Sequence, residues 1–285
     1  MIVHGLRIYP LKSARGVTLS SSAVSPAGLS GDRQLMLIDE QARFLTQREH
    51  PQLAKVSVQA RADGYEFAFG NGEAITTPVP GGGRRENVQV WHSTVNAAVF
   101  DETINRHLSD WLGRPARLVM FDGQSARNAN PDWAGHNAPI SFSDGYPVLI
   151  TTTGSLRGLN DDLAQQGHRP VPMARFRPNI VIEHEEPWSE DYWSAIEING
   201  LRFDLVKPCQ RCVVTTQDQL SGETGHGDPM PALRRLRMSA DARVKGVLFG
   251  WNTAPRGTGE IRVGDRVKII DKRADGWPLR DVTAA

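Results

Sequence analysis

The sequence predicts a mainly β protein with a few helices (α+β), in which each half closes into a barrel or sandwich. Short apolar or alternating runs recur along the chain, for example over 2–10 and 33–40, and turn residues separate them. Few stretches show helical spacing. The length of 285 residues is enough for two hydrophobic cores. We therefore expect an N-terminal β-barrel-like domain followed by a second β-barrel domain.

The first half is predicted to consist of strands and one helix. The run over 54–73 indicates two strands about a turn, and the glycine-rich stretch 78–86 is typical of a flexible loop. A helix is predicted within 101–115, with Asp101 as its N-cap and Gly113 at its end. The apolar face of this helix consists of Ile104, Leu108, Trp111 and Leu112.

A strand over 117–122 closes the first half, and the following residues, up to 138, are polar and rich in turn residues. We place the domain boundary at residue 122. The predicted domains cover 1–121 and 122–272, and a C-terminal tail covers 273–285.

The second half begins with a strand that runs into a helix. Ser155 is the predicted N-cap of that helix, and Gly167 lies at its end. A second helix is predicted around 230–239. Further strands are predicted over 177–185, 194–208, 212–218, 246–253 and 259–270.

The composition argues against several classes of function. Charged residues make up 23% of the chain and the net charge is +1, so bulk attraction to nucleic acid or to an acidic membrane is not expected. The start lacks the apolar run of a signal peptide, and no stretch approaches the ~18 apolar residues of a membrane span. Two cysteines cannot build a disulfide framework, so we expect a cytoplasmic protein.

Both cysteines, Cys209 and Cys212, lie in one stretch over 204–218. A structural zinc site needs a second local pair of ligands, and no two histidines lie within five residues of each other. A dithiol redox pair needs a helix after it, whereas the β-branched run 213–216 favours a strand. Zinc binding and dithiol chemistry are therefore both poorly supported by the spacing.

A single functional thiolate is the third interpretation. In an extended segment the residues i and i+3 point to opposite faces, so Cys209 and Cys212 need not share a target. Lys207 and Arg211 would favour a thiolate beside them and attract an anion. Two ordinary buried cysteines without a function remain an open alternative.

The stretch "KPCQRCVVTTQDQLSGE" (207–223), followed by "LFGWNT" (248–253) and the strands over 259–270, resembles the MOSC family of molybdenum-cofactor domains. Residues 6–56 resemble the β-barrel domain that precedes MOSC in the amidoxime-reducing component and in bacterial YcbX-like proteins. The similarity covers nearly the whole chain in the family's order.

The resemblance implies that Cys212 is the protein ligand of molybdenum and the catalytic thiolate, with Cys209 a neighbour that does not coordinate. It also implies the molybdenum cofactor (Mo-molybdopterin), while pyridoxal phosphate is not expected. The positions that match the surroundings of the cofactor in the family are Lys12, Ser13, Arg33, Arg177 and Arg211. Ser143 and the threonines 151–153 lie near family contact segments.

The residue types fit such a ligand, because a molybdopterin carries a phosphate and a polar ring that need fixed positive charge and small donors. On these grounds Thr46, Arg48 and Asn179 are further candidates for binding the cofactor. Taken singly, a loop Lys or Arg such as Lys12 or Arg177 is more often solvated surface.

The resemblance implies reduction of N-hydroxylated small molecules, such as amidoximes, hydroxylamines and hydroxylated base analogues. The chain has no cysteines to spare for an iron–sulfur cluster, so we expect a separate electron-donor protein of ferredoxin, flavin or cytochrome type. Neither nucleic acid nor a membrane is an expected partner. Two alternatives stay open: a non-catalytic cofactor carrier or sulfur-handling protein, and a cofactor-free dithiol oxidoreductase.

Overall fold

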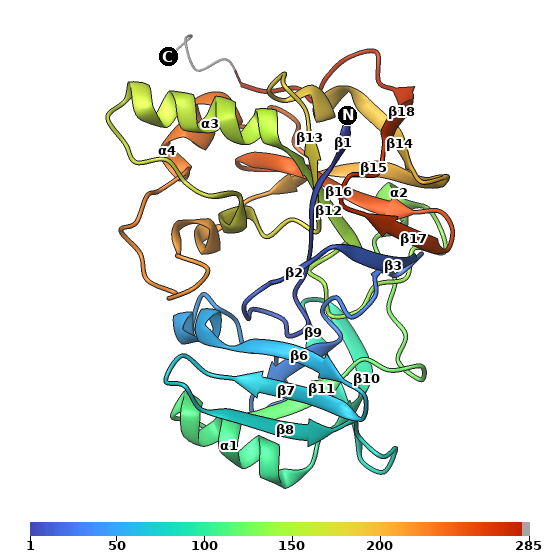
Figure 1. The fold of residues 1–285 in the computed structure, drawn as a ribbon, viewed down its shortest axis with the longest axis vertical. Helices are drawn as coiled ribbons and strands as arrows, with labels where there is room; N and C mark the ends of the chain where they lie inside the picture. The colour runs from blue at the N-terminus through green and yellow to red at the C-terminus, as the bar shows by residue number, and fades with distance from the viewer. Residues whose placement is uncertain (281–285) are drawn as a thin grey trace.

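The computed structural model describes residues 1–280, which form two lobes (Figure 1). One lobe holds β6 to β11 with α1, and the other holds β12 to β18 with α3 and α4. The chain is mainly β with four α-helices among the described residues, so the predicted fold class is confirmed. Within the same residues, no helix combines the length and the apolar character that crossing a bilayer requires.

Two antiparallel sheets form the first lobe, with strand orders β5-β11-β10-β9 and β6-β7-β8. Their bounds are β5 (Leu35–Ile38), β6 (Ser57–Arg61), β7 (Gly64–Ala68), β8 (Ala74–Pro78), β9 (Arg85–Val90), β10 (Ser93–Val99) and β11 (Arg117–Met120). Strands β5, β6, β7 and β11 agree with those predicted over 33–40, 54–73 and 117–122, whereas β8, β9 and β10 lie outside the predicted ranges. A 3-10 turn, η1 (Pro51–Lys55), precedes β6.

Helix α1 (Glu102–Leu112) covers the core of this lobe and has the predicted ends. The Asp101 carboxylate accepts hydrogen bonds from the first-turn amides, and Gly113 ends the helix in the left-handed conformation. Ile104 and Leu108 pack into the core shared with β5, β6 and β7. Capping and periodicity were therefore sufficient to place this element.

An eight-stranded sheet forms the second lobe, with strand order β18-β14-β15-β16-β12-β13-β1-β2. Its strands are β1 (Ile2–Ile8), β2 (Val17–Leu19), β12 (Val148–Thr152), β13 (Ile180–Glu183), β14 (Trp193–Ile198), β15 (Leu201–Gln210), β16 (Leu248–Pro255) and β18 (Val267–Lys272). A small sheet contains β3 (Ser21–Ser25), β4 (Gly28–Leu29) and β17 (Gly259–Arg262). The helices are α2 (Pro131–Ala134), α3 (Thr153–Gln165) and α4 (Met230–Leu236).

The first thirty residues share sheets with the second half of the chain. In β1, Leu6 pairs with Ile180 of β13, and β3 pairs with β17. The segment after β1 therefore lies beside residues more than 160 positions later: the Tyr9 hydroxyl donates to the carbonyl oxygen of Pro178 at 3.2 Å. The domain boundary at residue 122 stays a prediction. Strands from before this residue pair with strands from after it.

The predicted strand over 212–218 is wrong, because Val213–Thr216 forms a single 3-10 turn, η4. The hydroxyl groups of Thr215 and Thr216 donate to the carbonyl oxygens of Cys212 and Val213, at 2.9 and 2.8 Å. Such back-bonding offers the backbone an alternative to a sheet ladder. Cys212 therefore lies two residues after the end of β15, at the start of η4, and not within a strand.

The predicted N-cap of α3 is also wrong. The Thr152 hydroxyl accepts from the Ser155 amide, so Thr152 caps the helix. The Ser155 hydroxyl instead donates to the buried Glu190 carboxylate at 2.7 Å. The helix begins at Thr153, so Ser155 lies inside its first turn, and the Thr152 hydroxyl also donates to Glu190, at 3.0 Å.

Candidate functional site

A cavity of about 400 Å³ lies where the segment after β1, the first lobe and the second lobe meet. Its wall includes ten of the residues that we predicted to lie at or near the site: Lys12, Ser13, Arg33, Thr46, Arg48, Ser143, Arg177, Asn179, Arg211 and Cys212. Thr151, Thr152 and Thr153 are absent from this wall, and their hydroxyl groups bond elsewhere. Residues far apart in sequence therefore converge on one site.

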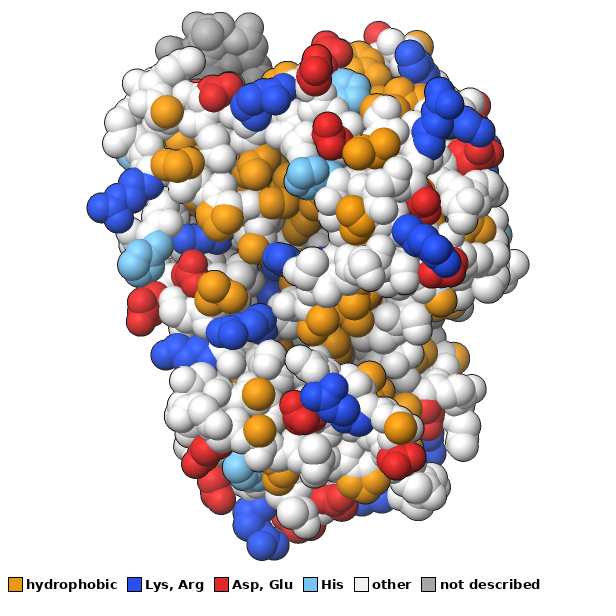
Figure 2. Space-filling model, viewed as in Figure 1, with side chains coloured by type: hydrophobic (Ala, Val, Ile, Leu, Met, Phe, Trp, Pro, Cys, Tyr) orange, Lys and Arg blue, Asp and Glu red, His pale blue; other side chains and the backbone are white. Residues whose placement is uncertain are grey.

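The cavity wall is strongly cationic. Its basic residues are Lys12, Arg33, Arg48, Arg175, Arg177, Lys207 and Arg211, and Asp144 is the acidic residue among the described residues that line it. Lys and Arg side chains also gather along part of the boundary between the lobes on the face in Figure 2. A concave surface with this excess of positive charge favours an anionic ligand.

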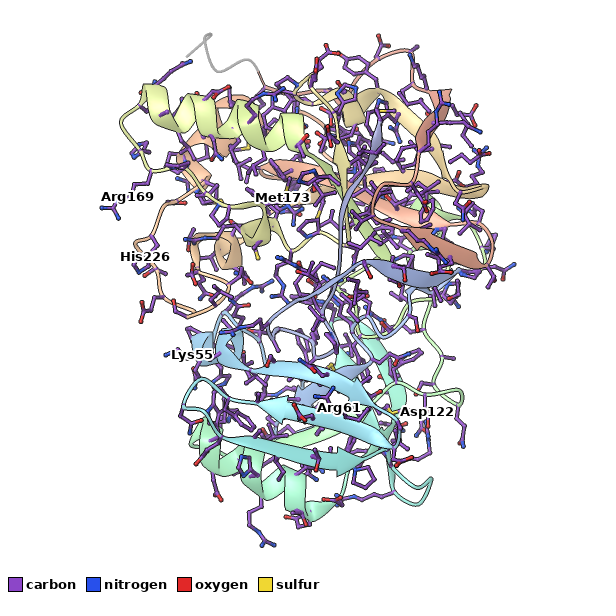
Figure 3. All side chains as sticks on the ribbon, in the orientation of Figure 1. Lys55, Arg61, Asp122, Arg169, Met173 and His226 are labelled. Carbon is purple, nitrogen blue, oxygen red and sulfur yellow. The ribbon has the colours of Figure 1, made fainter. Side chains whose placement is uncertain are left out.

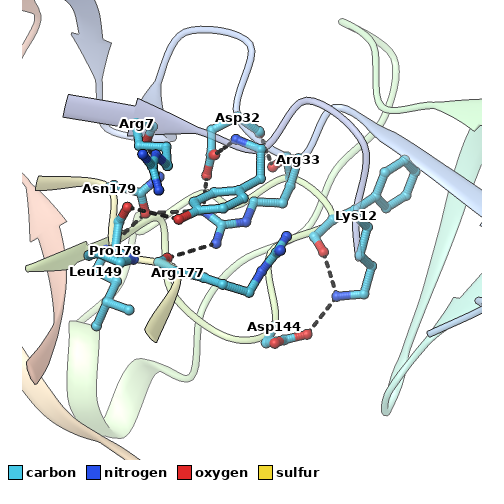
Figure 4. Close-up of polar contacts among 12 residues, drawn as sticks. Arg7, Lys12, Asp32, Arg33, Asp144, Leu149, Arg177, Pro178 and Asn179 are labelled. Carbon is cyan, nitrogen blue, oxygen red and sulfur yellow. Dashed lines mark hydrogen bonds and ion pairs between the residues drawn. The ribbon is translucent and has the colours of Figure 1, made fainter. Parts of the chain in front are cut away.

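The guanidinium groups of Arg33 and Arg177, which Figure 4 shows close together, both lie over the ring of Tyr9. The guanidinium carbons of Arg33 and Arg177 lie 4.3 and 4.2 Å from the ring centre. Arg33 is paired with the Asp32 carboxylate at 2.5 Å, whereas Arg177 forms no ion pair within residues 1–280. Burial, together with the Arg33 charge, lowers the pKa of Arg177 to about 10. An anion at Arg177 would relieve this unbalanced charge.

The Asn179 side chain fixes this cluster. Its Oδ1 accepts from the Leu149 amide and from Arg33 Nη1, both at 3.1 Å, and its Nδ2 donates to the Arg7 carbonyl oxygen. Asn179 is 1% exposed. Because its amide is already engaged by protein groups, Asn179 orients Arg33 and offers little to a ligand.

Lys12 is buried in the wall and has protein partners. Its ammonium group donates to Asp144 Oδ1 at 2.6 Å and to the Phe142 carbonyl oxygen at 2.8 Å (Figure 4). Burial lowers the pKa of Lys12, and the Asp144 carboxylate opposes that shift. The ammonium charge is therefore held in place in the wall before any ligand binds.

The two cysteines line the same cavity, although in an extended segment they would point to opposite faces. The ladder between β15 and β16 shifts register between Pro208 and Gln210, and the chain turns into η4 directly afterwards. Strand alternation therefore fails at this point. Cys212 is exposed, whereas Cys209 is half-buried and burial raises its pKa. The more accessible thiol is that of Cys212.

Arg211 binds the protein backbone. Its Nε and Nη2 donate to the Phe249 carbonyl oxygen at 2.9 and 2.6 Å, and its Nη1 donates to the Phe176 carbonyl oxygen at 2.9 Å. A guanidinium used in this way fixes the segment between β15 and η4. Its charge still lines the cavity, but its donors are mainly structural.

Arg175 holds the other side of the Cys212 turn. It is 1% exposed, and it donates to the carbonyl oxygens of Thr216 and His226 at 2.6 and 2.7 Å. His226 lies at the outer edge of the second lobe, in the loop before α4 (Figure 3). Arg175 therefore ties both ends of the loop that follows Cys212 to the cavity wall.

An aromatic part of the wall was missed by the sequence analysis. The rings of Phe44 and Trp91 lie 4.9 Å apart, and the Arg48 guanidinium carbon lies 5.2 Å from the Trp91 ring centre. Trp91 Nε1 donates to Asp144 at 3.1 Å. Trp91 has a positive φ of 53° in the turn between β9 and β10, and no sequence signal indicated that this hairpin faces the cavity.

Two family models match most of the chain. The model of the MOSC N-terminal beta barrel domain matches residues 1–115, and the model of the MOSC domain matches residues 137–268. The chain belongs to the MOSC family. This agrees with the resemblance carried by the segment around Cys212 and by the N-terminal half.

Curated relatives of this MOSC protein are similar to it over most of both chains. It is 29% identical to mitochondrial amidoxime-reducing component 1 of Xenopus laevis, over 95% of this chain and 83% of the relative. It is 28% identical to the Homo sapiens protein of the same name, over 94% and 82%. A solved structure, the YUAD protein from Bacillus subtilis, aligns over 93% of both chains with a TM-score of 0.38 and 8% identity.

Proposed function

We propose that this protein is a molybdenum-dependent reductase of N-hydroxylated small molecules, with Cys212 as the protein ligand of the metal. The observation that carries the proposal is the exposed Cys212 thiol in the wall of a cationic cavity. Support comes from the family and from relatives named for amidoxime reduction.

The donor set fits the proposed Mo-molybdopterin. A thiolate is a ligand that soft metals accept, and Cys212 is the accessible thiol of the cavity. The phosphate of a molybdopterin needs a cation that is not already neutralised, and Arg177 is such a cation among the described residues. The hydroxyl groups of Ser13 and Ser143 are small donors in the same wall.

Each residue then has a separate task. Cys212 would hold the metal, and Arg177 would bind the anionic part of the cofactor, with Arg33, Lys12 and Arg48 adding positive charge. When bound, the molybdenum centre supplies the two-electron chemistry that removes an oxygen atom from nitrogen. The overall change consumes two electrons and two protons and releases water. We propose that the electrons come from a separate donor protein, which the cytoplasm would provide.

Two alternatives predict different behaviour of the same cavity. A cofactor carrier or sulfur-handling protein would bind molybdopterin without turnover. A cofactor-free dithiol oxidoreductase would use Cys209 and Cys212, and both thiols line the cavity. The exposure of Cys212 and the raised pKa of the half-buried Cys209 favour one functional thiol over a pair.

The test is turnover of benzamidoxime by the molybdenum-loaded full-length protein, with a chemically reduced dye as electron donor. We expect benzamidine to form and Cys212→Ala to abolish it. Molybdenum-loaded protein that forms no benzamidine would favour the carrier. Dithiol activity that persists without molybdenum and requires both cysteines would favour the second alternative.

A further inference from the structure

Gln219 links Arg177, a cavity cation that forms no ion pair within residues 1–280, to the turn that carries Cys212. Its Oε1 accepts a hydrogen bond from Arg177 Nη1 at 2.8 Å. Its Nε2 donates to the carbonyl oxygens of Val214 and Gln217, at 3.3 and 3.0 Å. The Gln219 side chain is 7% exposed, so these bonds are shielded from competition with water.

The turn η4, whose Val214 carbonyl oxygen the Gln219 amide contacts, begins directly after Cys212. Cys212 is the N-cap of η4, and its carbonyl oxygen accepts from the Thr215 amide at 3.1 Å. Val214, whose carbonyl oxygen Gln219 binds, also lines the cavity. Movement of the η4 backbone would therefore move the Cys212 thiol as well.

The segment that carries Gln219 is itself anchored to the N-terminal part of the chain. Arg15 Nη2 donates to the Leu220 carbonyl oxygen at 2.7 Å. Gly222 has a φ of 79°, and a Cβ atom there would lie 2.0 Å from the Pro51 carbonyl oxygen, so the two backbones are in close contact. Gln219 thus acts from a fixed segment on two groups of the cavity wall.

The Arg177 side chain has few other constraints. Within residues 1–280 the Arg177 guanidinium donates to Gln219, and its other N–H donors make no further hydrogen bond there. The group lies over the Tyr9 ring and lines the cavity. An anion that binds those donors would fix the guanidinium, and through Gln219 it would fix the turn. The same connection must act in reverse, because coupling between two binding events is reciprocal.

We propose that Gln219 is a positioning residue that couples the occupancy of Arg177 by an anion to the conformation of the Cys212 turn. A bound anionic group then orders the thiol that lies beside it. The inference rests on the proposed function for the identity of the natural anion, which would be the anionic part of the cofactor. The coupling itself needs no metal and can be measured with inorganic phosphate.

The test uses full-length protein made in a host that cannot synthesise molybdopterin, in a Cys209→Ser background. The measured quantity is the rate constant for alkylation of Cys212 by iodoacetamide, with and without inorganic phosphate. Gln219→Met keeps the side-chain volume and removes the amide. Gln219→Glu keeps the acceptor for Arg177 and removes the Nε2 donor. Gln124→Met changes an exposed glutamine outside the cavity and is the matched control.

We expect phosphate to slow alkylation in the background protein and in Gln124→Met. Without phosphate, both Gln219 variants should alkylate about three- to tenfold faster, because the bonds to the turn are lost. In Gln219→Met the effect of phosphate should disappear as well. The proposal would be overturned if the folded Gln219 variants alkylated at the same rate as the background protein and were protected by phosphate to the same extent. It would also be overturned if phosphate did not slow alkylation of the background protein. Because no molybdenum is present, this result is independent of reductase activity.

Discussion

The Lys12 ammonium and the Asp144 carboxylate lie 2.6 Å apart although 132 residues separate them in the chain. The Lys12 side chain is 6% exposed and that of Asp144 is 76% exposed. The pair joins the segment after β1 to the loop before β12, and it fixes one cation of the cavity wall. Its loss should therefore affect both stability and the charge of the cavity.

Asp144→Asn should lower the free energy of unfolding by about 1–2 kcal/mol, less than for a fully buried pair because the carboxylate is open to solvent. It should also lower the pKa of Lys12 further, since the Asp144 charge opposes the shift caused by burial. Urea denaturation of Asp144→Asn, Lys12→Met and the double variant measures the coupling. Strictly additive effects would show that the two charges do not interact.

The ion pair of Asp122 with Arg85 should make the stability of the fold depend on pH in acid. Arg85 hydrogen-bonds its carboxylate and lowers its pKa from 3.8 to about 2. A carboxylate whose pKa is lowered in the folded state stabilises the fold at pH values above its ordinary pKa. This contribution is lost as the pH falls from 3.8 towards 2. Asp122→Asn should cost about 1–2 kcal/mol at pH 7 and flatten that acid limb. Urea midpoints from pH 7 to pH 2 measure the effect.

The control for Asp122 is Asp161→Asn, which changes an exposed carboxylate of α3 that forms no ion pair in the described residues. This variant should keep the wild-type slope of stability against pH. An Asp122→Asn protein with the same slope as wild type would contradict the contribution assigned to Arg85.

Arg177 should determine how the protein responds to anions. Without a ligand, Arg177→Met should change stability little, because the lost hydrogen bond is offset by removal of an unneutralised charge beside Arg33. Phosphate at about ten times its Kd should raise the Tm of wild type by about 2–4 °C and leave Arg177→Met unchanged. Thermal melting with and without phosphate measures this difference.

Arg169→Met is the comparison for the anion response, since Arg169 is exposed at the outer edge of the second lobe (Figure 3). It should retain the full response to phosphate. Equal losses in Arg169→Met and Arg177→Met would mean that phosphate acts through general charge and not through the cavity.

Arg211 should behave mainly as a structural residue. Arg211→Lys replaces three hydrogen bonds to the Phe249 and Phe176 carbonyl oxygens with a single flexible ammonium. The free energy of unfolding should fall by about 1–3 kcal/mol. Arg234→Lys, an exposed change on α4, should have no measurable effect. If Arg211→Lys is as stable as wild type, its contacts with the backbone are not significant.

Local features of the fold were predictable because local interactions determine them. Helix α1 follows from Asp101, Gly113 and the apolar spacing between them. The 3-10 turn at Val213–Thr216 was not predictable from β-branching, since the threonine hydroxyl groups bond the backbone instead of a neighbouring strand. The pairing of β1 with β13 was also hidden, because it depends on contacts between distant parts of the chain.

The candidate site was likewise predictable in its residue types but not in the contacts that these residues make. Residue chemistry and the family resemblance indicated residues that the fold does bring into one cavity, including Lys12 and Arg177. Neither could be distinguished from surface charge without knowing its surroundings, such as Asp144 beside Lys12. Trp91 and Gln219 gave no signal, since their roles depend on the hairpin and the segment that carry them.

Molybdenum content is the most direct test of the central claim, that Cys212 alone holds the metal. Full-length wild type, Cys209→Ala and Cys212→Ala would be purified from the same molybdopterin-competent host, and metal per chain measured by mass spectrometry. We predict that wild type and Cys209→Ala contain similar amounts of molybdenum and that Cys212→Ala contains almost none. Wild-type molybdenum content in a folded Cys212→Ala protein would contradict the account, and equal loss in both variants would indicate a paired ligand.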